Sequence, residues 1–119
     1  MNLIAGWTGI LLGCVAGSAL GFFFEDENWL GGYGSWRRRL LRLGHISFLG
    51  IGLLNLAFGL TFKNLDAPLI ASWMFIASLA SMPLVCVLSA WRKSSTVFFF
   101  IPVVSLIAGT AITLWRLCW

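Results

Sequence analysis

The chain has 119 residues, of which 60% are hydrophobic and only 10% are charged, whereas a soluble domain is usually about 25% charged. The net charge of +4 comes from residues at the ends of long apolar runs, and without a continuous basic surface we expect no nucleic-acid partner. The composition predicts an all-α integral membrane protein, a single four-helix bundle over residues 1–119, and we expect its location to be a bacterial inner membrane.

The first apolar segment, residues 3–24, has no charged residue and is long enough to cross a ~30 Å hydrocarbon core as a helix. A small residue stands at every fourth position of this segment, namely Ala5, Gly9, Gly13, Gly17 and Gly21. Such a glycine zipper lets two helix backbones approach closely. We expect it to face either another subunit or the last helix of this chain, which carries Ser105, Gly109 and Thr113 at the same spacing.

The second predicted helix spans residues 36–62 and follows a loop that opens with three acids and closes with arginines. Ser35 is the expected N-cap. One face of this helix collects residues at alternating steps of three and four: His45, Phe48, Gly52, Asn55, Gly59 and Phe62. An unpaired amide in mid-membrane is costly, so we expect Asn55 to make a packing hydrogen bond to another helix.

Arg38, Arg42 and His45 project from roughly the same side of the second helix, at its start. Two guanidiniums above an imidazole could hold an anionic lipid headgroup, because Arg pairs bidentately with phosphate. They could also serve a tetrapyrrole, haem b or chlorophyll, with His45 as axial ligand and Gly52 making room for the ring. Alternatively, the arginines only set the topology while His45 bonds a backbone carbonyl.

The third and fourth helices are predicted over residues 68–90 and 97–115, with Asp66 as a possible N-cap of the third. The first and third loops together hold six Lys or Arg, while Lys63 and Arg116 are the two on the other side. The positive-inside rule therefore predicts that these two loops are cytoplasmic and that both termini lie on the non-cytoplasmic side.

Catalytic and metal-binding patterns are missing from the sequence. A single His cannot supply an acid, a base and an orienting group together, so we expect no enzymatic activity from this chain alone. Met82 and Cys86 are four residues apart, but nothing in the spacing brings His45 to them as a third soft ligand, and we expect no metal site.

Four helices in about 120 residues is the size of the small multidrug resistance transporters and of the dimeric fluoride channels. The chain lacks the glutamate that those transporters carry in their first helix and the Phe/Thr/Ser-rich segment that those channels carry in their third, so it is assigned to neither family.

The leading hypothesis is a small non-enzymatic subunit that packs against partner helices in a larger membrane complex, or against itself, and holds an anionic lipid or cofactor group at its cytoplasmic rim. One alternative is a homodimeric channel for a small solute, lined by Asn55, Ser105 and Thr113. The other alternative is a tetrapyrrole-binding electron-transfer or pigment subunit that uses His45.

Overall fold

The computed structural model describes all residues from Met1 to Trp119, and it contains helices and no strand. Its elements are α1 (Asn2–Gly21), the short 3-10 helix η1 (Trp29–Gly31), α2 (Trp36–Thr61), α3 (Leu69–Trp91), the 3-10 helix η2 (Lys93–Phe99) and α4 (Phe100–Cys118). α1, α2, α3 and the continuous segment Lys93–Cys118 are each long and apolar enough to cross a membrane.

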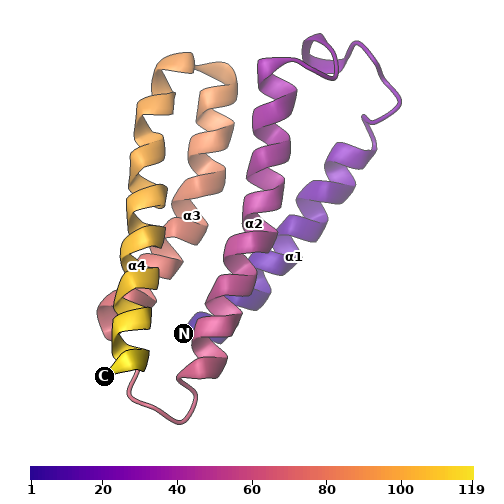
Figure 1. Ribbon diagram of the computed structural model, residues 1–119. Coiled ribbons are helices and arrows are strands. Elements are labelled where there is room, and N and C mark those ends of the chain that lie inside the picture. Colours follow the sequence, from indigo (N-terminus) through magenta and orange to yellow (C-terminus); the bar gives the residue numbers. More distant parts are fainter.

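The four long helices lie side by side in chain order, and both termini are at the same end of the molecule (Figure 1). α1 packs mainly against α2, α2 against α3, and α3 against α4. The result is a flattened body of 52 × 28 × 18 Å, in which α1 and α4 form no packing interface with each other. The expectation that the small residues of the first and last helices pack together is therefore wrong.

The boundaries of α2 and α3 match the sequence expectations to within one residue, and those of α1 and α4 match less closely. The Ser35 hydroxyl accepts a 3.3 Å hydrogen bond from the backbone N–H of Arg38, which confirms Ser35 as the N-cap of α2. Asp66 does not cap α3, because that helix starts after Pro68 and has no side-chain cap. α1 ends at Gly21, three residues before the predicted end, and α4 continues to Cys118.

The middle of the small-residue stripe in α1 faces α2. A Cβ built on Gly9 would lie 3.1 Å from the carbonyl oxygen of Phe48, and one built on Gly13 would lie 2.6 Å from the side chain of Leu49. Gly6, which is outside the predicted stripe, also lies against α2, whereas Gly21 has no neighbour within 4 Å. The missing side chains thus let the two helix backbones pack closely, as is common between membrane helices.

Aromatic side chains join α2 to α3, and α4 packs onto the same group. Phe58, Phe62, Ala71 and Phe75 form a buried cluster, with Leu106 and Ile112 of α4 packed against it. Gly109 brings α4 close to α3, because a Cβ there would lie 3.3 Å from the Cβ of Met74. These contacts hold the second half of the chain together, and α3 also reaches the start of α2, where the Trp36 indole N–H donates to the carbonyl of Ser89 at 2.9 Å.

Candidate functional site

The segment that connects α1 to α2 forms a tight turn around η1. Leu30, Gly31 and Gly32 have φ values of 56°, 90° and 96°, in the left-handed region that glycine adopts without strain. Within the turn, the rings of Phe23 and Trp29 stack with their centroids 4.6 Å apart. The turn therefore folds back toward the first residues of α2, where the arginines begin.

Arg38 binds this turn from the first part of α2. Its side chain is only 5% exposed, and its guanidinium donates to the backbone carbonyls of Asp26 at 3.1 Å, Phe23 at 3.2 Å and Phe24 at 3.3 Å. The guanidinium carbon also lies 5.5 Å from the ring centroid of Trp29. Arg38 thus binds carbonyl groups of residues that follow the end of α1, which no longer take part in the hydrogen bonds of that helix.

Arg42, one helical turn further along, is less fully engaged. Its Nη2 donates to the carbonyl of Tyr33 at 2.9 Å and its Nε donates to the carbonyl of Arg38 at 3.4 Å. The guanidinium lies over the Tyr33 ring, 4.1 Å from its centroid. These two bonds use two of the five N–H groups of a guanidinium, so three have no hydrogen-bond partner in the chain.

His45 packs across the small-residue face of α1. Its Nδ1 lies 2.8 Å from the carbonyl oxygen of Gly13. The imidazole occupies the space beside Gly17, where a Cβ would lie 2.5 Å from Cε1. Because a carbonyl oxygen can only accept a hydrogen bond, this contact places the hydrogen on Nδ1 and leaves Nε2 without a partner in the chain.

Arg38, Arg42 and His45 line one common pocket of about 240 Å³. The other lining residues are Gly17, Leu20, Gly21, Phe24, Trp29 and Tyr33. No carboxylate is among them, and all hydrogen bonds of the two guanidiniums go to backbone carbonyls, so their positive charge is not neutralised. The volume is below the ~300–1,000 Å³ typical of sites for drug-sized ligands, so the pocket suits a small anionic group.

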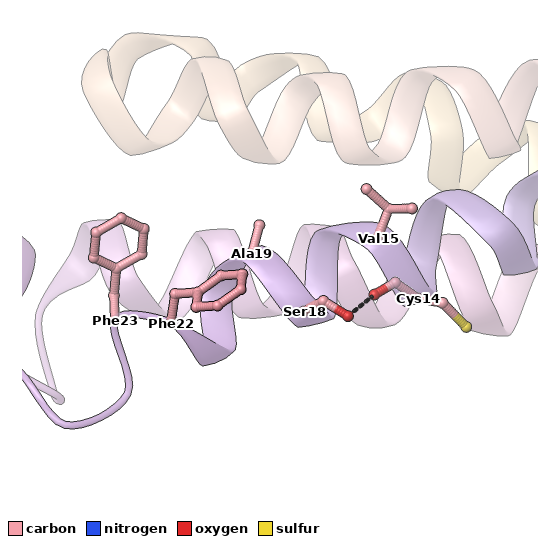
Figure 2. A pocket seen from close by; sticks show the side chains of 6 residues that line it. All are labelled: Cys14, Val15, Ser18, Ala19, Phe22 and Phe23. Atoms are coloured by element: carbon pink, nitrogen blue, oxygen red, sulfur yellow. Dashed lines mark hydrogen bonds between the residues drawn. The ribbon is translucent and has the colours of Figure 1, made fainter.

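A second depression lies on the part of α1 that α2 does not cover (Figure 2). It is lined only by residues of α1 and the turn after it: Cys14, Val15, Ser18, Ala19, Phe22 and Phe23. The single hydroxyl in this set, that of Ser18, donates to the carbonyl of Cys14 at 2.9 Å. An open apolar surface with no free polar group resembles ordinary lipid-facing surface and offers no chemistry of its own.

Asn55 belongs to a closed polar network that joins three helices. Its Nδ2 donates to the carbonyls of Ile51 at 3.0 Å and Phe75 at 3.1 Å, and its Oδ1 accepts from Asn2 at 2.9 Å. Asn2 also donates to the carbonyl of Ser72 at 3.3 Å and accepts from the Ser72 hydroxyl. Asn55 is completely buried and fully hydrogen-bonded, so its amide does not face a pore.

The remaining predicted residues are distributed over several interfaces. On α2, Gly52 and Gly59 lie against Gly6 and Leu3 of α1. On α4, the Thr113 hydroxyl donates to the carbonyl of Gly109 in its own helix at 2.7 Å, and Ser105 is partly exposed. No group of three His, Cys, Asp or Glu side chains lies together as metal ligands would.

Asn2 and Tyr33 are site residues that the sequence analysis did not single out. Asn2 stands just before the first apolar segment, where it is a second side-chain amide at the end of a helix. This was the one signal in the sequence that could have predicted a partner for Asn55. Tyr33 lies in a glycine-rich loop, where nothing in the sequence shows that its ring stacks on Arg42.

Comparison with known proteins gives no relative for this fold and site: no family model, no curated protein and no solved structure matches the chain.

Proposed function

We propose that this chain is a small, non-enzymatic integral-membrane protein that holds an anionic lipid group in the pocket between α1, α2 and their connecting loop. It crosses the bilayer four times with its termini on the non-cytoplasmic side, and the pocket opens at the cytoplasmic rim. Its outer faces pack against partner helices of a larger membrane assembly.

The pocket of Arg38, Arg42 and His45 is the observation that carries this proposal. The anionic lipids of the cytoplasmic leaflet attract basic residues by about 1 kcal/mol each. Arg42 keeps free N–H groups in the planar arrangement that pairs with phosphate. A phosphate in the pocket would supply acceptors to these groups and offset a positive charge that no carboxylate of the lining balances.

The charge distribution supports the orientation of the pocket. Arg37 and Arg39, near the start of α2, and Arg92 and Lys93, between α3 and the rest of η2, are all exposed. The start of α2 and the end of α3 lie at the same end of the molecule (Figure 1). At the opposite end, the only Lys or Arg residues are Lys63 and Arg116. The positive-inside rule places the more basic end in the cytoplasm.

The outer helices support the expectation of partners. α1 and α4 each pack mainly on a single neighbour and expose large apolar side chains along most of their length, among them Ile4, Leu11, Val104 and Ile107. In a bilayer these faces meet lipid chains or other helices, and van der Waals packing decides between the two.

The two alternative functions have less support. A channel lined by Asn55, Ser105 and Thr113 needs these side chains at one surface, but Asn55 is buried between α1, α2 and α3. A tetrapyrrole beside His45 needs space at Gly52, but the backbone of α1 occupies it, since a Cβ on Gly52 would lie 3.0 Å from the carbonyl oxygen of Gly6.

Native mass spectrometry of the purified protein tests the lipid proposal. Arg42→Gln removes the free donors of the pocket, whereas Arg39→Gln removes the same charge from an exposed position outside it. We expect retained anionic lipid in the parent and in Arg39→Gln, and its loss in Arg42→Gln. Equal retention by all three proteins would refute the lipid site.

A further inference from the structure

We propose that the pocket selects a phosphate group that carries a hydroxyl, as in the glycerol headgroup of phosphatidylglycerol, with Arg42 pairing with the phosphate and His45 accepting a hydrogen bond from the hydroxyl. This inference rests on the proposed function and adds to it the chemical class of the ligand.

The contact between His45 and Gly13 determines which hydrogen bond His45 offers to the pocket. Nδ1 carries the hydrogen that the Gly13 carbonyl accepts at 2.8 Å. In a neutral imidazole one nitrogen donates and the other accepts, and the partner of the first determines the role of the second. With this tautomer of the neutral ring, Nε2 is an acceptor, which would repel a phosphate oxygen and bind a hydroxyl.

The two arginines of the pocket have different roles. Arg38 already donates to three backbone carbonyls and is nearly inaccessible. Its role is therefore to position the loop, and it has no free pair of N–H groups for a ligand. Arg42 has three N–H groups left and provides the main phosphate contact. The charged and titratable side chains of the lining are thus Arg38, Arg42, His45 and the Tyr33 phenol.

Arg42 and His45 lie on the same side of α2 and line the same pocket. They are three residues apart on α2, and such pairs have their Cβ atoms about 5–6 Å apart on one face of a helix. Because both side chains line one pocket of about 240 Å³, a phosphate that carries a short polyol can contact both. No carboxylate or amide side chain lines the pocket as a competing acceptor, and Phe24 and Trp29 are among its apolar lining residues.

Two lipids of equal charge provide the decisive comparison. Phosphatidylglycerol and phosphatidylmethanol are both singly charged phosphodiesters, and only the first has headgroup hydroxyls. Binding is measured in nanodiscs by native mass spectrometry. Because a neutral hydrogen bond is worth about 0.5–1.5 kcal/mol, we expect the parent protein to prefer phosphatidylglycerol about two- to tenfold.

His45→Asn is the matched variant, because the Asn amide can still donate toward the Gly13 carbonyl but has no group at the place of Nε2. We expect it to bind both lipids with a ratio near one. A preference that persists in His45→Asn would overturn the role of His45. The lipid comparison in the parent does not depend on the folding of any variant.

The remaining outcomes separate this inference from the proposed function. Equal binding of both lipids by the parent would overturn the hydroxyl selection and leave the anionic site in place. Binding of neither lipid would overturn both. Free glycerol 3-phosphate is added as a competitor: displacement of phosphatidylglycerol assigns the recognised group to a soluble polyol phosphate, and a lack of displacement assigns it to the lipid.

Discussion

Asn2 donates a 2.9 Å hydrogen bond from its side-chain amide to Oδ1 of Asn55, which ties the first turn of α1 to the interior of α2. Ser72 of α3 completes the network by donating to Oδ1 of Asn2. Every side-chain donor and acceptor in this group thus has a partner on a neighbouring helix or a backbone carbonyl. The members of such a closed network depend on one another for stability, because removing one side chain leaves the polar groups of the others buried and unpaired.

We therefore expect Asn2→Ala and Asn55→Ala each to lower the free energy of unfolding by about 1–2 kcal/mol. The double variant should cost less than the sum of the two single variants, since the same bond is lost in all three. Unfolding in mixed detergent micelles measures these changes. Asn64→Ala, in the exposed loop between α2 and α3, is the control and should stay within about 0.5 kcal/mol of the parent. Strict additivity would contradict the direct coupling.

Gly17 and Gly21 provide a matched pair for the His45 contact. Ala at position 17 would place its Cβ 2.5 Å from Cε1 of His45, whereas Ala at position 21 meets nothing within 4 Å. We expect Gly17→Ala to displace the imidazole and weaken retention of anionic lipid severalfold, with a cost of about 1–3 kcal/mol in stability from overpacking. Gly21→Ala should leave both unchanged. Lipid retention and thermal unfolding of the two variants measure the difference.

Replacing Gly13 by Leu tests the packing of α1 on α2 directly. The new side chain would overlap with Leu49, whose Cδ2 lies 2.6 Å from the position of the first added carbon. We expect impaired folding or a loss of at least about 1–3 kcal/mol in stability. If the variant melts at the temperature of the parent, α1 does not pack on α2 through this face.

Arg38→Gln should loosen the connection between α1 and α2. It removes a guanidinium that holds three backbone carbonyls, and hydrogen bonds to charged groups are each worth about 1.5–3 kcal/mol. We expect amide hydrogen exchange over residues 22–35 to speed up by about tenfold or more, with exchange in α3 and α4 unchanged. Arg39→Gln is the control, because Arg39 is exposed and the substitution removes the same charge. A similar acceleration of exchange in Arg39→Gln would mean that the loss of charge alone causes the effect.

The orientation in the membrane is tested by labelling a cysteine at position 94. Ser94 is exposed in η2, and the native Cys14 and Cys118 are exposed as well, so both are first replaced by Ser. We expect Ser94→Cys to react with an impermeant maleimide from the cytoplasmic side only, because the basic loops are retained there. Reaction from the outside only would invert the topology and place the pocket on the non-cytoplasmic surface.

The sequence by itself determined the number of long helices, the N-cap at Ser35 and the position of α2 to within one residue. Apolar length and capping chemistry are local properties, so they can be read without knowing which helices are neighbours. The shared face of Arg38, Arg42 and His45 follows in the same way, since it depends only on the geometry of one helix.

Only the tertiary structure decided what those residues meet. Helix packing in lipid depends on how well two helix surfaces fit each other. The sequence shows the small residues of α1, but it does not show whether they pack on α2 or on α4. In the structure they fit α2, with Gly17 leaving the space that His45 fills. The sequence likewise gives no reason to distinguish Arg38 from Arg42. The fold of the loop does, because the carbonyls of residues 23, 24 and 26 accept hydrogen bonds from Arg38, whereas Arg42 keeps three N–H groups without a partner in the chain.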